Sequence, residues 1–424
     1  MIVAIPYGKN KEVTFAIKEE NFSGIIEPSS VKPAPDPLKE IEAAIDHPIG
    51  TPSLQEIVKF DHRVNIICDD ISRPTPVHLI LPILIKKLKA IGVKNDNIKI
   101  VMALGSHRYM TEDEMKARVG EEIYREFKVV NSEFKREDDL VELGVTADGV
   151  EIYACKEAMD SDIRIGIGNI VPHPVMGWSG GAKILFPGVT GEKTVAQFHI
   201  KGGLADENLF GLEDWPIRLN MENWVENVGL DFIINTVLTT SSEIYKVVAG
   251  HYVHAQRKGV EYAKIALGQK VEKKVDIVVA SSFPADQDLW QSPKAMFSAE
   301  HALKKEGKGT IILVSPNYEG IGPHQEYPKF FGMDDAEEIL FRLYQGEEMG
   351  VDPLAVSVGT AMSKMRQRVN LIMVSDGVTK EEMDTCKIGY YPLAELQRAI
   401  DETIAKYKDP SVAVVRHGGE LFIY

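Results

Sequence analysis

The segment from His173 to His199 concentrates residues that could do chemistry. It has a histidine at each end, Lys183 near its middle and five glycines within 27 residues. Glycines at this density let the backbone approach a ligand closely and turn N–H groups toward an anion. A lysine among them could meet a phosphate or act as a nucleophile, and the histidines could bind a metal or transfer protons. We expect this segment to form the floor of a site for a phosphorylated cofactor, with or without a metal.

Polar residues also follow the strands that the hydrophobic pattern predicts. Residues 64–68, 98–104, 163–167 and 276–280 are apolar runs of strand length. The loops that follow them carry Asp69, Asp70 and Arg73; Ser106, His107 and Arg108; the histidine–glycine segment; and Asp286, Gln287, Gln291 and Lys294. Ligands of open parallel sheets bind outside the carboxyl ends of the strands. We therefore expect these loops to converge on one cleft between two domains.

The elements that must position these loops alternate between strand and helix patterns. The first residues alternate in strand fashion, and a proline-rich connector follows at residues 28–38. Further strands are predicted at 232–238, 245–249, 310–314 and 371–374, and helices at 77–91, 255–267 and 298–305. This alternation predicts an α/β fold: two domains with largely parallel sheets and an active-site cleft between them.

A polar stretch at residues 268–274 is the best candidate for a domain boundary. We expect an N-terminal α/β domain over 1–270 that carries the cofactor-binding segment. A C-terminal α/β domain over 271–405 would contribute substrate residues. Residues 406–424 would add strands at 412–415 and 421–423, as a closing hairpin that packs back on the N-terminal domain.

Composition excludes several classes of function. The chain has 424 residues and a formal net charge of −15, which disfavours a general nucleic-acid-binding role because that role needs a basic face. No run of about 18 apolar residues occurs, and the first residues lack a signal-peptide pattern. The three cysteines are far apart and form no CxxC pair, which argues against a cysteine-built zinc or iron–sulfur site. We expect a cytoplasmic protein with no nucleic-acid or membrane partner.

Known phosphate-binding motifs do not fit the glycine-rich segment. Residues 166–171 have Val171 where the dinucleotide fingerprint GxGxxG needs its third glycine. Residues 188–194 have too short a gap between glycines for a P-loop, and Glu192 separates Gly191 from Lys193. Two alternatives stay open on these residues alone: a nucleotide-dependent transferase or ATPase, and a non-catalytic carrier of a nucleotide cofactor.

Taken together, the motifs resemble those of the nickel-dependent lactate racemase family along nearly the full chain. The matching segments are DDISRPTP at 69–76, ALGSHR at 103–108, HPVMGWSGGAK at 173–183, FPG at 186–188, the histidine at 199 and DQDLWQSPK at 286–294. The central HxxxGxSGGxK pattern with histidines on both sides is specific, whereas each other motif alone would be weak.

The resemblance implies a cofactor and a role for each matching residue. The cofactor would be a nickel-pincer nucleotide, pyridinium-3,5-bisthiocarboxylate mononucleotide, which holds nickel between two sulfur-bearing arms and is joined covalently to Lys183. His199 would complete the nickel coordination, and His107 and His173 would be the catalytic acid–base pair. The remaining matches are Ser179, Gly180, Gly181 and Asp70 near the cofactor, and Arg73, Gln291 and Lys294 around the substrate.

The implied enzyme is an isomerase, a racemase or epimerase that inverts Cα of a 2-hydroxy acid by reversible hydride transfer to the nickel-pincer nucleotide. One histidine would remove the hydroxyl proton while the Cα hydrogen leaves as hydride, and a planar 2-oxo acid would form. Lactate-handling members carry a tryptophan near the substrate methyl, whereas residues 355–365 contain none here. The implied partners are the cofactor-synthesis enzymes and a small 2-hydroxy acid, for which a sugar acid or another acid larger than lactate is a plausible choice.

Overall fold

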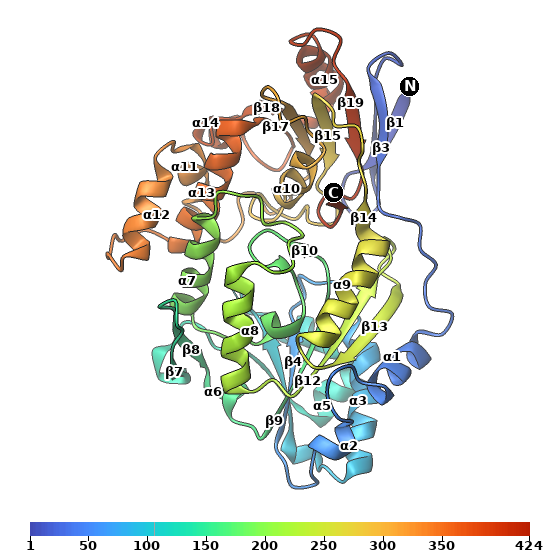
Figure 1. Ribbon diagram of the computed structural model, residues 1–424, viewed down its shortest axis with the longest axis vertical. Coiled ribbons are helices and arrows are strands. Elements are labelled where there is room, and N and C mark those ends of the chain that lie inside the picture. Colours follow the sequence, from blue (N-terminus) through green and yellow to red (C-terminus); the bar gives the residue numbers. More distant parts are fainter. Residues whose placement is uncertain (106) are drawn as a thin grey trace.

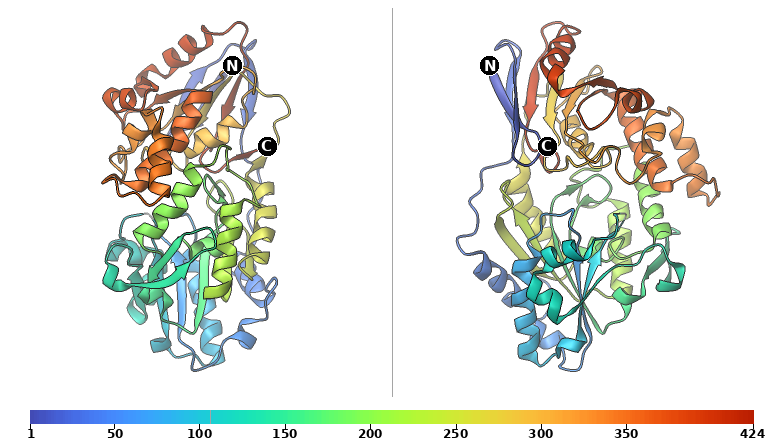
Figure 2. Two further views of the ribbon diagram at one scale, coloured as in Figure 1. Left: turned by 60° about the vertical axis from the view of Figure 1, so that its left-hand side comes forward. Right: turned by 180° about the vertical axis from the view of Figure 1, so that it is seen from behind.

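The computed structural model describes residues 1–105 and 107–424, so the predicted loop residue Ser106 lies outside the described residues. Two six-stranded sheets lie at opposite ends of the long axis, each with helices packed against it (Figures 1 and 2). The predicted fold class is confirmed: two α/β domains with largely parallel sheets. No helix among the described residues has both the length and the apolar character that a membrane span requires.

The first sheet carries the loops that the sequence pattern singled out. Its strands, in spatial order, are β13 (Ile244–Gly250), β12 (Phe232–Leu238), β9 (Ile163–Asn169), β4 (Val64–Asp69), β5 (Ile98–Ala103) and β6 (Lys128–Asn131). All neighbours are parallel except β12 and β13. From β4 the chain proceeds to β5 and β6 on one side and to β9 and β12 on the other. The order therefore reverses between β4 and β9, which leaves a crevice at their carboxyl ends.

Helices and short strands of the same half cover this sheet and build its upper edge. They are α1 (Pro37–Asp46), α2 (Leu54–Ile57), α3 (Val77–Ile91), α4 (Glu112–Val119), α5 (Glu121–Glu126), β7 (Leu140–Val145), β8 (Glu151–Cys155), α6 (Lys156–Met159), β10 (Pro172–His173), β11 (Gly177–Trp178), α7 (Glu192–Gly203), α8 (Pro216–Val228) and α9 (His254–Leu267). The helix predicted at 77–91 is confirmed as α3, whose Leu81, Leu84 and Leu88 are completely buried. It ends at Gly92, which has a positive φ of 103° as a left-handed cap requires.

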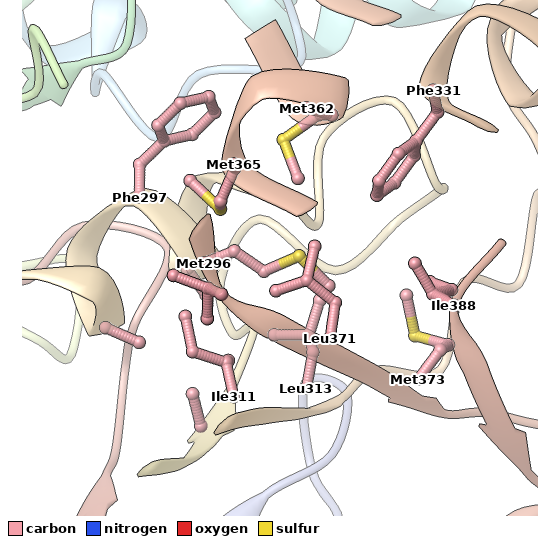
Figure 3. Close-up of a cluster of buried hydrophobic side chains, with 14 of the residues drawn as sticks. Met296, Phe297, Ile311, Leu313, Phe331, Met362, Met365, Leu371, Met373 and Ile388 are labelled. Atoms are coloured by element: carbon pink, nitrogen blue, oxygen red, sulfur yellow. The ribbon is translucent and has the colours of Figure 1, made fainter. Parts of the chain in front are cut away.

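The second sheet is parallel throughout. Its order is β18 (Gly389–Tyr391), β17 (Asn370–Val374), β16 (Thr310–Val314), β15 (Ile277–Ser281), β19 (Val412–Val415) and β3 (Phe22–Ile26). Its helices are α10 (Lys294–Glu300), α11 (Tyr327–Gly332), α12 (Ala336–Tyr344), α13 (Pro353–Arg368), α14 (Lys380–Thr385) and α15 (Leu396–Ile404). Figure 3 shows Met296 of α10 and Met362 and Met365 of α13 packed over Leu313 and Leu371 of the sheet. The order of strands reverses between β15 and β19, so a second crevice lies there.

The first strands and β19 pack differently from the expected division, whereas Phe422 of the last strand packs back against Trp178 as expected. β1 (Ile2–Pro6) and β2 (Glu12–Ala16) pack on the second sheet, and β3 extends that sheet beside β19. The expected hairpin of 412–415 and 421–423 is wrong, because β19 lies between β15 and β3. The last strand, β20 (Phe422–Ile423), instead pairs with β14 (Gly268–Gln269). Pairings this distant in sequence are set by tertiary packing and leave no local signal.

Candidate active site

The two crevices face one cleft between the sheets. Two adjoining cavities of about 170 and 760 Å³ lie there. Predicted site residues that line both are Asp70, Arg73, His107, His173, Ser179, Gln291 and Lys294. Lys183, His199 and Gly180 line the smaller cavity. The structure therefore brings together every predicted site residue except Gly181.

Gly181 points away from the cleft. Its N–H donates to Asn235 Oδ1 at 2.8 Å, and a Cβ there would lie 2.6 Å from the Tyr252 carbonyl oxygen. The N–H is thus already satisfied within the protein and is not presented to a ligand. The structure thus does not bring Gly181 to the cavity with the other predicted residues. Its positive φ of 61° lets the chain turn into the helical turn that carries Lys183.

The glycine-rich loop is held from below by a buried arginine. Arg218 of α8 is completely buried, and it donates to the Trp178 carbonyl oxygen at 2.6 Å and to Glu222 at 2.8 Å. The sequence reasoning missed this residue, because a lone arginine in a helical pattern carries no motif.

Residues 177–181 also have the GxSxG spacing of a nucleophile elbow, but the Ser179 hydroxyl donates to the Asn169 carbonyl oxygen at 2.8 Å. Ser179 therefore fixes the loop.

Lys183 has the character of a nucleophile. No described residue forms a hydrogen bond or ion pair with its amine. Burial, aided by the charge of Arg73, lowers the pKa of Lys183 to about 7. Much of the amine is therefore uncharged at neutral pH, as attack on an electrophilic cofactor requires.

His199 presents one ring nitrogen to the cavity. On α7, its Nδ1–H donates to the Val195 carbonyl oxygen at 2.9 Å, which leaves the Nε2 lone pair free. Burial lowers the pKa of His199 to about 4, so the ring stays neutral and able to bind a metal. Within residues 1–105 and 107–424 no cluster of three or more His, Cys, Asp or Glu side chains could hold a metal alone. A metal at His199 would need its other ligands from a cofactor.

His107 is backed by a carboxylate. Its Nδ1 lies 2.6 Å from Asp70 Oδ2, and Asp70 is only 3% exposed. Burial alone would raise the pKa of Asp70, but the charge and hydrogen bond of His107 hold it well below its usual range. Because the Nδ1–H is used in this way, Nε2 of His107 is the atom that can exchange a proton with a substrate.

His173 is held in a different way. Its Nδ1 accepts hydrogen bonds from the backbone N–H groups of Val175 and Met176, both at 3.1 Å. The neutral ring therefore carries its hydrogen on Nε2. Burial, together with the charges of Lys183 and Lys294, lowers the pKa of His173 well below its usual value. In this geometry Nε2 of His173 is a hydrogen-bond donor, whereas Nε2 of His107 in its neutral form is an acceptor.

Cations dominate the remainder of the site. Lys294 is the first residue of α10, and its Nζ donates to Gln291 Oε1 at 2.6 Å. The helix predicted at 298–305 therefore begins earlier, at Lys294, because Pro293 with its φ of −64° already fits a helix start. Burial lowers the pKa of Lys294 well below its usual value, with contributions from Arg73 and Lys183. Cations that depress one another's pKa values in this way favour an anionic ligand between them.

Small residues of α13 border the smaller cavity. Ser357, Val358 and Ala361 line it, beside Gly203 at the end of α7. A Cβ on Gly203 would lie 2.5 Å from the Ser357 carbonyl oxygen, so the two helices touch there. This stretch contains no tryptophan, and its small side chains face the cleft together with those of Lys364 and Arg368.

Comparison with known proteins identifies the family. The lactate racemase N-terminal domain matches residues 7–209, and the lactate racemase C-terminal domain matches residues 270–423. The lactate racemase of Thermoanaerobacterium thermosaccharolyticum is 30% identical over 349 residues, which cover 80% of each chain. That of Lactiplantibacillus plantarum is 30% identical over 344 residues, with the same coverage. This chain belongs to the lactate racemase family.

Solved structures agree with the family assignment. The lactate racemase apoprotein of T. thermosaccharolyticum superposes with a TM-score of 0.87 at 25% identity, over the full length of both chains. A Thermotoga maritima protein shares the fold, with a TM-score of 0.68 at 18% identity over 91% of this chain and 97% of its own. Membership of the lactate racemase family makes this chain an isomerase.

Proposed function

We propose that this member of the lactate racemase family inverts Cα of a 2-hydroxy acid, with a nickel-pincer nucleotide attached to Lys183. The observation that carries the proposal is the pairing of two prepared atoms on one cavity. One is the Lys183 amine, whose pKa of about 7 leaves it free to form a covalent bond. The other is Nε2 of His199, fixed as a neutral ligand by the bond from Nδ1 to Val195. Phosphate binding by a transferase or ATPase needs neither an uncharged lysine amine nor a histidine fixed as a metal ligand.

The described residues fit such a cofactor. Lys183 would hold it covalently, and His199 would add one nitrogen ligand to a nickel otherwise bound by the cofactor's sulfur-bearing arms. This agrees with a site in which the described side chains cannot hold a metal alone. When bound, the nickel-pincer nucleotide would supply a reversible acceptor for the hydrogen that leaves Cα with its electron pair.

The protein's own groups would orient the substrate and move its hydroxyl proton. Arg73 can grip a carboxylate with two hydrogen bonds, and Lys294 adds a second cation beside it. Nε2 of His107 would take the proton from the Cα hydroxyl, and Asp70 would stabilise the resulting imidazolium. His173 would donate a hydrogen bond from Nε2 to the substrate oxygen, and His107 would return its proton to that oxygen at the end of the reaction.

The substrate is proposed to be larger than lactate. Ser357, Val358 and Ala361 present small side chains to the cavity and Lys364 and Arg368 present cations, so α13 places no aromatic side chain there. We take this lack of an aromatic side chain to favour a sugar acid or another extended 2-hydroxy acid.

The test is to produce the protein together with the cofactor-synthesis enzymes. We expect a mass increase on the Lys183 peptide and about one nickel per chain. We also expect inversion of at least one 2-hydroxy acid, measured by chiral chromatography. Lys183→Arg should lose the mass increase and the activity. An unmodified Lys183 without nickel would contradict the proposal, and tight ATP binding would then favour a transferase. A modified Lys183 with no inversion of any acid would instead indicate a cofactor carrier.

A further inference from the structure

A short turn after β19, residues 417–420, lies at the crevice of the second sheet. It reads HGGE, and no motif in the sequence analysis included it. Its backbone is bonded to the end of β15: the Gly418 N–H donates to the Ser281 carbonyl oxygen at 2.9 Å, and the Gly419 N–H donates to that of Phe283 at 3.3 Å. The turn is thus fastened to the loop that carries Gln291 and Lys294.

Gly418 and Gly419 let the turn lie directly against the backbone at the end of β15. A Cβ on Gly418 would lie 2.7 Å from the Ser281 carbonyl oxygen, and one on Gly419 would lie 2.5 Å from that of Ser282. On the other side of Glu420, the buried Leu421 accepts a hydrogen bond from Ser298 Oγ of α10 at 2.5 Å. The backbone of Glu420 is therefore fixed on both sides relative to α10, whose first residue is Lys294.

The Glu420 side chain lines the larger cavity with Arg73, His107 and Lys294. Its carboxylate forms no hydrogen bond and no ion pair with any described residue. Burial raises the pKa of Glu420, and the nearby charges of Lys294 and Arg73 oppose that rise. Glu420 is half-buried, so its carboxylate still faces the cavity. A bound ligand that displaced water from this carboxylate without offering a donor would leave it unsatisfied, which is costly, so a ligand that supplies a donor would be favoured there.

The charges around Glu420 limit what that ligand group can be. An ammonium group would be repelled by Lys294 and Arg73. A second carboxylate would be repelled by Glu420, because Lys294 and Arg73 would already pair with the substrate's first carboxylate. An apolar chain would leave the carboxylate without a partner. A hydroxyl group is neutral and donates a hydrogen bond, so it is the group that satisfies the site.

We infer that Glu420 is a specificity-determining residue whose carboxylate accepts a hydrogen bond from a substrate hydroxyl beyond the Cα hydroxyl and excludes dicarboxylates. This inference rests on the proposed function for the position of the substrate carboxylate. It narrows the substrate class to monocarboxylic 2-hydroxy acids that bear further hydroxyls.

Three acids of equal carbon number test it: gluconate with further hydroxyls, 2-hydroxyhexanoate with an apolar chain and 2-hydroxyadipate with a second carboxylate. We expect the full-chain apoprotein to bind gluconate at least roughly tenfold more tightly than the other two in calorimetric titration, as one charge-assisted hydrogen bond provides. Glu420→Gln should lose roughly tenfold in gluconate affinity and gain affinity for 2-hydroxyadipate. In the cofactor-loaded enzyme the ratios of kcat/KM should change in the same direction.

Glu319→Gln is the matched control, because it removes the same charge from an exposed position at the rim of the same cavity. It should leave the selectivity unchanged. Equal binding of the three acids by the wild type, or unchanged selectivity in Glu420→Gln, would overturn the inference. Failure of the loaded enzyme to invert any acid, with a Glu420-dependent preference for gluconate intact in the apoprotein, would count against the proposed function and support the role of Glu420.

Discussion

The crevice of the first sheet and that of the second face the same cleft but are built differently. Beside β4 and β9 lie His107, His173, Lys183 and His199, and the three histidines have one ring nitrogen already committed to a carboxylate or to the backbone. Beside β15 and β19 lie cationic, amide and carboxylate groups with less fixed partners, and small side chains border them from α13. We infer that the first crevice determines the reaction and the second determines which acid undergoes it.

The largest effect that would sharpen this comparison is expected from Asp70→Asn. An amide cannot stabilise an imidazolium and allows the wrong tautomer of His107, so kcat of the loaded enzyme should fall by about 10³-fold. The Lys183 adduct and nickel content, measured by mass spectrometry and metal analysis, should not change. Ser72→Ala removes a hydroxyl that donates to Asp70 at 2.6 Å and lies 3.2 Å from His107 Nδ1, but it keeps the carboxylate and should have a much smaller effect. A decrease within threefold for Asp70→Asn would refute the role given to the pair.

An intermediate effect is expected on the other side of the cleft, from Ala361→Phe. The ring would fill the cavity beside α13, so kcat/KM for a six-carbon acid should fall about tenfold or more relative to that for lactate. Adduct formation should be unaffected. Gln367→Phe adds the same ring on an exposed part of the same helix and should change neither value. Equal losses for both acids would mean that α13 does not select the substrate by size.

The smallest effect is expected in the pH at which the Lys183 amine can be chemically labelled. Reductive methylation of the apoprotein requires the free amine, which predominates above the pKa of about 7 and is lost as the pH falls below it. Labelling of Lys183, followed by peptide mass spectrometry, should therefore be half-maximal near neutral pH. The exposed Lys193 pairs with Glu137, its pKa is raised, and it should be labelled only at much higher pH.

Arg73→Gln tests the cause of that shift. The charge of Arg73 contributes to the low pKa of Lys183, so its removal should move the labelling profile to higher pH while burial still keeps it below that of Lys193. An unchanged profile would show that Arg73 lies too far from the amine to act on it.

Local patterns in the sequence predicted the first crevice better than the second. Arg73, His107 and Lys294 could be found because each follows a buried apolar run, and such runs form strands whatever lies beside them. Glu420 could not be found, because its importance comes from the pairing of β19 with β15 over more than a hundred residues. Gly181 was predicted at the cavity and lies outside it, because a glycine that permits a turn and a glycine that exposes an N–H to a ligand look the same in sequence.

The position of β3 has a consequence for protein engineering. Its residues, Phe22–Ile26, form one edge of the second sheet, although they precede the whole of the first. A fragment that begins at the polar stretch 268–274 would expose β19 as an open edge, a common start of aggregation. Anyone exchanging the substrate-selecting half between relatives should therefore transplant residues 1–26 along with it, as a chimera with two junctions.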